Sequence, residues 1–402
     1  MTRSGFSAKR LTRVRDVLER RVDAGYSPGV AAVVARHGEV HIEAVGNLSF
    51  EGAGASRPMA ADSICRISSM TKSIVAACAM TLVEDCTLRL NDPVDALLPE
   101  LADMTVLADP NGPLDDTVPM NRPITLSDLL TCRLGTGAIL AEPGTVPICD
   151  ALNALDRGDG PDEPELSPGE WLRRLGTLPL VHQPGERWMY NTGPTATGLL
   201  IARATGMSLE DAVRERICEP LGMKDTTFGL GDASAGRAAA AYVYDEAAGE
   251  LVEEGLDGIR KRPSTFKAPA SGLVSTAVDI LAFASALLAG GTHRSERVLS
   301  RPSVSLMTSD HLTPAQKAAS RWIWPLEHFA DFGWGFGMEV RTRRTNLGPS
   351  AGSYGWYGKY GTAWCNDPAE DMTTIFMIQR EDGLELPALV DFWTAAYQAI
   401  VD

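Results

Sequence analysis

The feature that most limits the fold is the placement of strand-like segments at both ends of the 402-residue chain. Residues 28–46 contain two apolar, β-branched runs around the turn Arg36-His37-Gly38-Glu39, a pattern typical of a β-hairpin. Near the other end, residues 332–342, 353–367 and 372–380 alternate and are rich in aromatic and β-branched side chains. We therefore expect one antiparallel sheet that is built from both ends of the chain.

Helical patterns separate and flank these strands. We expect helices over residues 8–24, 67–85, 270–291 (with Ser275 or Thr276 as the N-cap) and 386–401, and a mostly helical segment with long loops over residues 91–256. The predicted fold class is α/β (α+β), an antiparallel sheet flanked by helices with an inserted, mostly helical lobe. The predicted domains are 1–90 plus 257–402 for the α/β lobe and 91–256 for the insertion, with an active site in the cleft between them.

The charge of the chain limits its partners. The formal net charge is −15, and no dense Lys/Arg run is present, which argues against a nucleic acid or an anionic membrane as partner. No apolar run reaches the length of a membrane span, and the charged, amphipathic N-terminal stretch lacks the apolar core of a signal peptide. We expect a cytoplasmic protein whose partner is a small-molecule ester or amide substrate.

The seven cysteines are an odd number at irregular spacing, without a CxxC pair. This pattern favours free, mostly buried thiols in a reducing compartment over a disulfide framework or a zinc site. We expect neither a metal nor a cofactor.

Ser69 and Lys72 form an SxxK pattern at the start of an apolar helical run. Residues three apart on a helix face the same way, and the free N–H groups and positive dipole of the first turn favour an alkoxide and an oxyanion there. Lys72 can act as a base only if burial or nearby positive potential lowers its pKa. Taken alone, the pattern fits a helix cap with a surface lysine equally well. A second copy, Ser264 and Lys267, lies between two prolines without helical periodicity, so we expect no chemistry there.

Two later segments add candidate residues, namely Tyr190 before Asn191-Thr192-Gly193, and Trp356-Tyr357-Gly358 before Lys359. With them the chain resembles the serine β-lactamase and penicillin-binding-protein superfamily, class C-like, and most closely the family VIII carboxylesterases. The resemblance covers most of the chain through six segments in family order, which are ISSMTKS, PITLSDLLT, QPGERWMYNTG, EPLGMKDTTF, SGLVSTAVDILAF and YGWYGKYGTAW.

This resemblance implies roles for individual residues. Ser69 would be the acylated nucleophile, and Lys72 with Tyr190 would share a proton as a coupled base. The backbone N–H groups of Ser69 and Lys359 would form the oxyanion hole. The substrate-binding residues would be Trp356, Tyr357, Gly358, Asn191 and Thr192.

The chain departs from the family pattern at three places. Trp356 begins the third motif, where true β-lactamases have lysine, and an aromatic residue there fits the esterase branch; Tyr357 then adds bulk where glycine is usual. Thr192 stands where the family usually has asparagine, and Cys132-Arg133-Leu134-Gly135 replaces a common His-Thr-Ser-Gly hinge. These departures concern β-lactam specificity and remove no bond-making group.

Other chemistries fit the residues less well. The six histidines are scattered, and the sequence contains neither a GxSxG elbow nor HExxH. The segment GWGFG (residues 333–337) continues into an alternating pattern, so we expect a strand there, not a phosphate loop, and Trp334 as a core residue.

The expected function is a serine hydrolase that forms an acyl-enzyme at Ser69, a carboxylesterase acting on small or short-chain esters. The alternatives are an amide or peptide hydrolase (D-aminopeptidase, D-Ala carboxypeptidase-like, β-lactamase or small-amide hydrolase), an acyltransferase, and a catalytically silent ligand-binding protein. We expect specificity to reside near Tyr357 and in loops 103–121 and 139–170, since loops vary on a fixed scaffold.

Overall fold

The structure is a computed structural model that describes residues 4–155, 166–245, 249–255, 266–320, 328–381 and 387–402. Its centre is a seven-stranded antiparallel sheet in the order β12-β13-β14-β15-β16-β1-β2. These strands are Phe332–Trp334, Glu339–Arg341, Tyr354–Tyr357, Ala363–Asp367, Met372–Met377, Gly29–Arg36 and Glu39–Gly46. Strand β1 pairs with β16 from Ala31↔Met377 to Arg36↔Met372, so the two ends of the chain meet in the middle of one sheet.

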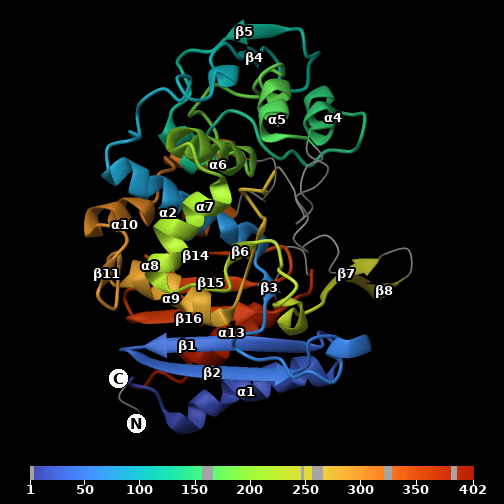
Figure 1. Ribbon diagram of the computed structural model, residues 1–402, viewed down its shortest axis with the longest axis vertical. Helices are drawn as coiled ribbons and strands as arrows, with labels where there is room; N and C mark the ends of the chain where they lie inside the picture. Colours follow the sequence, from blue (N-terminus) through green and yellow to red (C-terminus); the bar gives the residue numbers. More distant parts are fainter. Residues whose placement is uncertain (1–3, 156–165, 246–248, 256–265, 321–327, 382–386) are drawn as a thin grey trace.

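The sheet is buried on both faces, as the alternation along β1 shows. Val30, Ala32 and Val34 join an apolar cluster with helices α1 (Ala8–Asp23) and α13 (Pro387–Tyr397). Ala31 and Val33 point to the opposite face and pack with helices α2 (Thr71–Glu84) and α9 (Ala277–Leu288). Since successive strand residues face opposite sides, the sheet separates two helical layers (Figure 1).

Helix α2 is the centre of the second layer. Almost all of its side chains are buried, from Thr71 to Met80. Helix α6 (Thr192–Thr205) lies against α2 and α3, and its small residues permit a close approach, since a Cβ on Gly193 would lie 2.6 Å from the carbonyl oxygen of Leu129. Helix α2 therefore links the sheet to the helical segment that follows it in the chain.

The region between α2 and α9 is mostly short helices and loops, and Figure 1 draws its first part, through α6, at the upper end of the molecule. Its helices are α3 (Leu126–Leu130), α4 (Pro147–Asn153), α5 (Pro168–Leu175), α6, α7 (Leu209–Val213) and α8 (Glu219–Leu221). Its strands are β4 (Thr105–Leu107), β5 (Thr117–Pro119), β6 (Thr227–Phe228), β7 (Ala241–Asp245) and β8 (Glu250–Glu254).

The remaining described elements are short. They are β3 (Cys65–Arg66) and β9 (Leu273–Ser275), which pair with each other, β10 (Thr292–His293), β11 (Glu296–Arg297), α10 (Arg301–Met307), α11 (Pro314–Ala319) and α12 (His328–Asp331).

Most element predictions are confirmed, including the hairpin at residues 36–39, the late strands and the first and last helices. The predicted N-cap at Ser275 or Thr276 is Thr276, whose side chain accepts a hydrogen bond from the N–H of the third helical residue, Asp279. Three predictions differ. The expected helix over 270–291 begins at Ala277, because β9 precedes it and pairs with β3 and β6. The hairpin β7–β8 lies in a segment predicted to be mostly helical. Ser69 lies just before α2 and not within its first turn.

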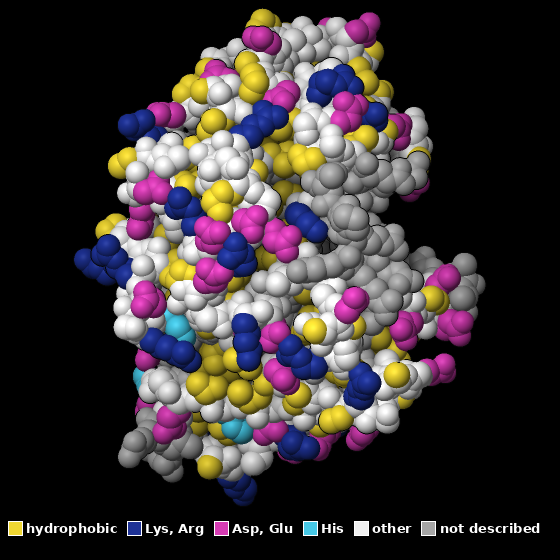
Figure 2. Space-filling model, viewed as in Figure 1, with side chains coloured by type: hydrophobic (Ala, Val, Ile, Leu, Met, Phe, Trp, Pro, Cys, Tyr) yellow, Lys and Arg dark blue, Asp and Glu magenta, His cyan; other side chains and the backbone are white. Residues whose placement is uncertain are grey.

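The surface charges and the state of the cysteines agree with what the sequence predicted. Figure 2 shows acidic side chains interspersed with basic ones over the visible face, without a continuous basic patch. All seven cysteines are free, and only Cys86 among them is exposed. No helix in the described part of the chain is both long and apolar enough to cross a membrane.

Candidate active site

Ser69 lies in a 3₁₀ turn, Ser68–Met70, that leads directly into α2. Ser68 has φ +43°, a backbone conformation that non-glycine residues rarely adopt, and its side chain is buried. The turn is held by a hydrogen bond from the Met70 N–H to the Ile67 carbonyl oxygen, 3.1 Å. The strained turn therefore directs Ser69 to the N-terminal end of a buried helix, where backbone N–H groups are available.

Lys72 lies one helical turn after Ser69 and is 1% exposed. Its Nζ donates hydrogen bonds to Ser69 Oγ, 3.0 Å, and to the Ala270 carbonyl oxygen, 2.9 Å. The prediction that the two side chains share one face is confirmed, and the alternative of a surface lysine is wrong. Burial disfavours the charged form of an amine, which is the direction that a general base requires.

Tyr190 brings a third group to the same place. The Lys72 Nζ lies 4.3 Å from the centroid of the Tyr190 ring. On the other side, Trp356 Nε1 donates a hydrogen bond to Tyr190 Oη, 3.0 Å. A donor aimed at the phenol oxygen stabilises its anionic form. Lys72 therefore lies between the hydroxyl of Ser69 and the ring of Tyr190.

An aromatic cluster holds Tyr190 in position. The Tyr190 ring centroid lies 5.5 Å from that of Trp188, 6.2 Å from that of Trp334 and 5.9 Å from that of Trp356. Trp334 is 1% exposed, as expected of a core residue, and Trp356 is also buried. The resemblance implied substrate binding by Trp356; in the structure its Nε1 also donates a hydrogen bond to Tyr190 Oη.

Strained backbone is concentrated around these groups. Besides Ser68, Asn191 has φ +82° directly after Tyr190, and Cys132 has φ +54° where its carbonyl oxygen accepts from the Met189 N–H, 2.7 Å. Such conformations persist only where the surrounding structure enforces them, and they are common at functional sites. Burial raises the pKa of the Cys132 thiol to about 12, so this cysteine is not a second nucleophile.

The end of β14 approaches the Ser69 turn through its backbone. A Cβ on Gly358 would lie 2.4 Å from the Ile67 carbonyl oxygen, so only glycine fits there. Lys359 follows in the turn after β14, and its side chain lies 3.6 Å from Glu381. Among the described residues, neither the Ser69 N–H nor the Lys359 N–H has a hydrogen-bond acceptor. The Trp356-Tyr357-Gly358 motif thus reaches the candidate nucleophile, with Tyr357 half-buried beside Trp356.

A cluster of Tyr360, Glu254 and Arg66 holds the turn after β14 in place. Tyr360 is 0% exposed and donates a hydrogen bond to Glu254 at the end of β8. Glu254 also pairs with Arg66 of β3, whose Nη1 lies 2.9 Å from its Oε2. Arg66 precedes Ser69 by three residues and Tyr360 directly follows Lys359. The cluster therefore connects the segments that carry the two free N–H groups.

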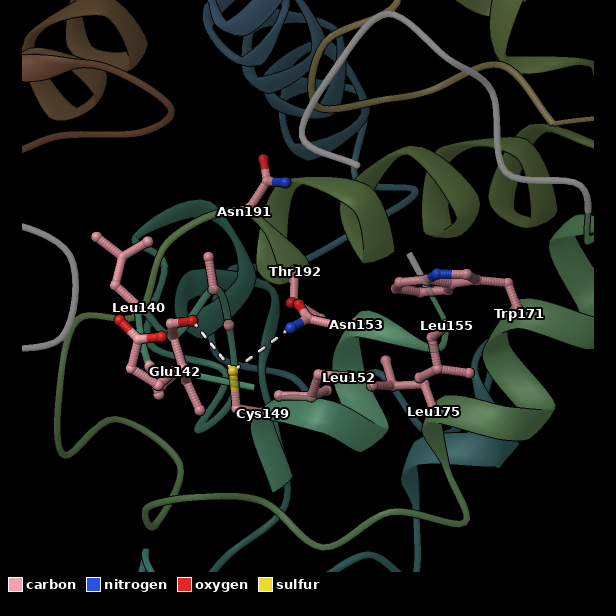
Figure 3. A pocket seen from close by; sticks show the side chains of 14 residues that line it. Leu140, Glu142, Cys149, Leu152, Asn153, Leu155, Trp171, Leu175, Asn191 and Thr192 are labelled. Atoms are coloured by element: carbon pink, nitrogen blue, oxygen red, sulfur yellow. Dashed lines mark hydrogen bonds between the residues drawn. The ribbon is translucent and has the colours of Figure 1, made fainter. Parts of the chain in front are cut away.

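A cavity of about 850 Å³ lies in the helical region, beside the start of α6. It is lined by residues 137–142, side chains of α4 and α5, and Asn191 and Thr192. Figure 3 shows Thr192 facing α4, while the Asn191 side chain points the opposite way. Of the predicted substrate-binding residues, these two border the cavity, whereas Trp356, Tyr357 and Gly358 lie at β14.

Sequence reasoning missed two contributors to the site. The Ala270 carbonyl oxygen accepts from Lys72 and carries no side-chain signal. Trp188, two residues before Tyr190, could have been found by its position. Most of the cavity lining lies within residues 139–155, inside the loop 139–170 where specificity was expected. Ser264 of the second SxxK copy lies outside the described residues.

The beta-lactamase family model matches residues 14–396. Protein Rv1367c of Mycobacterium tuberculosis is 36% identical over 371 residues, 91% of this chain and 89% of that protein. Esterase EstB of Burkholderia gladioli is 38% identical over 200 residues, 50% of this chain and 47% of that protein.

Solved structures show the same fold. EstCE1, described as a hydrolase with promiscuous acyltransferase activity, superposes with a TM-score of 0.78 at 23% identity, covering 97% of this chain and 99% of that one. Unliganded simvastatin synthase (LovD) of Aspergillus terreus in its selenomethionyl form gives 0.79 at 22% identity over 97% of this chain and 98% of its own. The protein is thus similar to esterases and acyltransferases, and it belongs to the beta-lactamase family.

Proposed function

We propose that the protein is a serine hydrolase that forms an acyl-enzyme at Ser69 and cleaves short-chain carboxylic esters. The observation that carries the proposal is the buried Lys72, whose Nζ lies 3.0 Å from Ser69 Oγ and 4.3 Å from the centroid of the Tyr190 ring. An amine buried against a hydroxyl and a phenol is arranged to move a proton.

In the acylation step, Ser69 Oγ attacks the ester carbonyl carbon and its proton passes to the Lys72–Tyr190 pair. The carbonyl oxygen becomes an oxyanion that accepts hydrogen bonds from the N–H groups of Ser69 and Lys359. The tetrahedral intermediate then collapses, the carbon–oxygen bond to the alcohol breaks, and the pair returns its proton to the leaving alcohol. In deacylation, a water molecule attacks the acyl carbon while the Lys72–Tyr190 pair takes its proton. The bond between the acyl carbon and Ser69 Oγ then breaks, the pair returns the proton to Oγ, and the carboxylic acid leaves.

The division into lobes supports this placement of the site. We propose that residues 1–90 and 257–402 form one lobe and residues 91–256 the other, with the substrate bound between them. Ser69, Lys72 and Lys359 belong to the first lobe, whereas Tyr190, Asn191 and Thr192 come from the second. Tyr190 is joined to the first lobe by its hydrogen bond from Trp356.

Acyl transfer to an alcohol is the second candidate function. It uses the same acyl-enzyme and differs only in whether water or another alcohol accepts the acyl group. A relative supports acyl transfer as a candidate, since acyltransferase mokF of Monascus pilosus is 32% identical to this chain over 182 residues. Adding a primary alcohol during turnover and measuring ester against acid product separates the two.

The test of the proposal is covalent labelling with a fluorophosphonate, followed by mass spectrometry of the peptide that contains Ser69. We expect one adduct, on Ser69, and its loss with Ser69→Ala and Lys72→Met. Ser73→Ala is the matched control, because Ser73 lies on the same helix and its Oγ donates to the Gly337 carbonyl oxygen instead, 2.9 Å.

Substrate class is measured on the same proteins with p-nitrophenyl acetate and butyrate, nitrocefin and a D-alanyl peptide. We expect the esters to turn over fastest, and Ser69→Ala to lower kcat at least ~10⁴-fold. Label on a residue other than Ser69, or unchanged ester turnover in Ser69→Ala, would refute the acyl-enzyme. Faster turnover of the peptide or nitrocefin than of the esters would refute the ester assignment alone.

A further inference from the structure

Strand β2 forms one edge of the seven-stranded sheet and is eight residues long. Its pairing with β1 runs without interruption from Gly29↔Gly46 to Arg36↔Glu39, so it contains no bulge. Its sequence, EVHIEAVG, contains neither proline nor lysine. Bulges, prolines and lysines are common features that prevent an edge strand from pairing with another chain. Strand β2 therefore lacks all three of these protections.

The geometry of the hairpin shows which backbone groups of β2 face outward. Residues 37–38 form a two-residue turn, and the strands close with the pair Arg36↔Glu39. The closing pair of such a hairpin exchanges two hydrogen bonds, and inward and outward backbone groups then alternate along the strand. The residues whose N–H and C=O groups point away from β1 are Val40, Ile42 and Ala44.

The outward edge is open over part of β2. At the far end of the strand, the Met59 N–H donates to the Gly46 carbonyl oxygen, 2.9 Å. Among the described residues, no backbone group outside the hairpin is hydrogen-bonded to residues 40–44. The open stretch is therefore residues 40–44, and Ile42 lies at its middle.

The side chains of this stretch add apolar surface. Val40 is 51% exposed and Ile42 is 42% exposed. Ile42 pairs with Val33, so both exposed side chains lie on the face of the sheet that carries α9. Figure 2 shows hydrophobic side chains gathered low in the view, where Figure 1 draws α9, β1 and β2. Exposed aliphatic side chains beside an open strand edge favour contact with another chain.

The charges of β2 favour a second copy of the same strand as its partner. With a two-fold axis at Ile42, that residue lies opposite its own copy, and His41 lies opposite Glu43 of the second copy. An axis at His41 would place Glu39 opposite Glu43, and an axis at Glu43 would place two copies of Glu43 opposite each other. Opposite charges across two strands stabilise the pair, and like charges destabilise it. Charge therefore selects the axis at Ile42, which is also the middle of the open stretch.

The side chains of His41 and Glu43 already interact within one chain. His41 Nε2 lies 3.1 Å from Glu43 Oε1, and Arg15 Nη1 lies 3.1 Å from Glu43 Oε2. An imidazole can donate a hydrogen bond to a carboxylate whether it is neutral or charged. In the paired register, each carboxylate lies beside the imidazoles of both copies. The open N–H and C=O groups of the two strands add about six backbone hydrogen bonds.

We infer that two copies of the chain associate through their β2 strands, which pair antiparallel about a two-fold axis at Ile42 and join the two sheets into one. Such a contact uses the same surface on both copies, as two-fold dimers do. The inference goes beyond the proposed function and does not depend on it.

Sedimentation velocity of the full chain tests the association. We measure at concentrations up to ~100 µM, where a micromolar Kd gives mostly dimer. We expect a species of twice 43.1 kDa for the native protein and only monomer for Ile42→Lys. Val118→Lys is the matched control, because Val118 is also 42% exposed on a strand, β5, and this variant should associate like the native protein.

Cysteine cross-linking tests the register. In a hydrogen-bonded antiparallel pair the Cα atoms lie ~5.5 Å apart, within the range of a disulfide. With Cys86, the exposed native cysteine, replaced by serine, Ile42→Cys should give a disulfide-linked dimer when oxidised glutathione is added. Val40→Cys is the control. Val40 faces Ala44 of the second copy, so the two copies of residue 40 stand ~13 Å apart along the strands and should not cross-link.

A charge exchange tests the partner of His41. His41→Glu places two carboxylates opposite each other at both ends of the pairing, and we expect the dimer Kd to rise at least ~10-fold. Combining His41→Glu with Glu43→His restores opposite partners across the two strands. The Kd of this double variant should return to within ~3-fold of the native value.

The outcomes decide the inference. A monomer at every concentration overturns it, and so does a dimer that persists in Ile42→Lys, because the copies then meet elsewhere. Equal cross-linking of Ile42→Cys and Val40→Cys, or no rescue by the charge exchange, overturns the register. Since both substituted aliphatic side chains are exposed, the melting temperatures of these variants as monomers should agree within ~2 °C, which separates lost association from lost folding.

Discussion

The two walls of the proposed active site are built in different ways. The sheet wall, residues 66–69 with 358–361, consists of backbone segments in contact so close that Gly358 has no room for a methyl group. The helical wall, residues 137–155 with Trp171 and Leu175, consists of side chains around open space. A wall fixed by backbone contacts can hold an oxyanion at a defined point, whereas a wall of side chains can change its shape without disturbing the chemistry. The difference predicts that substitutions in the first wall alter turnover and those in the second alter selectivity.

The largest effect should come from Gly358→Ala. The added methyl group would push β14 away from Ile67 and displace the Lys359 N–H from the oxyanion position. Loss of one oxyanion donor lowers kcat by ~10²-fold or more, so we expect that loss with little change in KM. Steady-state kinetics on p-nitrophenyl butyrate measures it. Gly169→Ala is the control, because nothing lies within 4 Å of a Cβ at Gly169. Equal activity of the two variants would mean that the sheet wall is not fixed by this contact.

A smaller effect is expected of Tyr360→Phe, which removes the hydroxyl that donates to Glu254. We expect kcat to fall ~10-fold and affinity for a boronic acid, which mimics the tetrahedral intermediate, to fall in parallel, because the turn carrying Lys359 loses its anchor. Tyr397→Phe is matched, since Tyr397 is also buried and donates to a carboxylate, Asp367, at 2.9 Å. Tyr397→Phe should lose at least as much stability as Tyr360→Phe, because Asp367 is fully buried whereas the Glu254 side chain is 34% exposed. If Tyr397→Phe lowered kcat by the same factor, the loss in Tyr360→Phe would reflect lower stability and not the position of the turn that carries Lys359.

The smallest effect on turnover, and a distinct one on stability, concerns His182 at the base of the helical wall. Burial and, to a smaller extent, Arg187 lower the pKa of His182, Glu186 opposes them, and the net result is a pKa of about 4. Because the unfolded chain takes up this proton near pH ~6.5 and the folded protein only near pH 4, the stabilising contribution is complete above pH ~6.5 and is lost as the pH falls toward 4. From these values, the free energy of unfolding at pH 5 should be lower than at pH 7.5 by about 2 kcal/mol from this group.

Urea denaturation of the native protein and of His182→Gln at both pH values checks this. The difference between the two pH values should be smaller in the variant by about that amount. An identical pH dependence in both proteins would show that acid acts through other groups. Turnover at pH 7.5 should change least of all the variants in this series, since His182 has no part in the proposed proton transfer.

The sequence predicted the sheet wall better than the helical one, and the reason is physical. Strands β1, β2, β14, β15 and β16 are rich in apolar, β-branched or aromatic residues, so their sequences alone indicate strands of a largely buried sheet. Ser69, Lys72 and Tyr190 were predicted together because their motifs resemble a family, and the structure brings Lys72 into contact with the other two.

The rest depended on tertiary contacts that leave no local pattern. The Ala270 carbonyl oxygen serves Lys72 through its backbone alone. Strand β9 is three residues long and is separated from α9 by Thr276 alone, too short a segment to show a strand pattern before β3 pairs with it. The hairpin β7–β8 is half exposed, and its alternation is weak. The volume of the cavity depends on how several segments pack against one another, so it cannot be predicted from the sequence of any one of them.

The meeting of both chain ends in one sheet has a consequence during synthesis. Strand β1 leaves the ribosome long before β16, its neighbour on one side, has been translated, and Ser7 must wait to donate to the Ala399 carbonyl oxygen, 2.8 Å. Until then, we expect β1 and β2 to form a hairpin whose β1 edge is unpaired and apolar. Such an edge can pair with a strand of another chain or be bound by a chaperone. Ser69 and Lys72, the proposed nucleophile and base, are likewise made early, but Lys359, the proposed second oxyanion donor, follows some 290 residues after Ser69, so under this proposal a stalled chain carries the pair without a complete oxyanion hole.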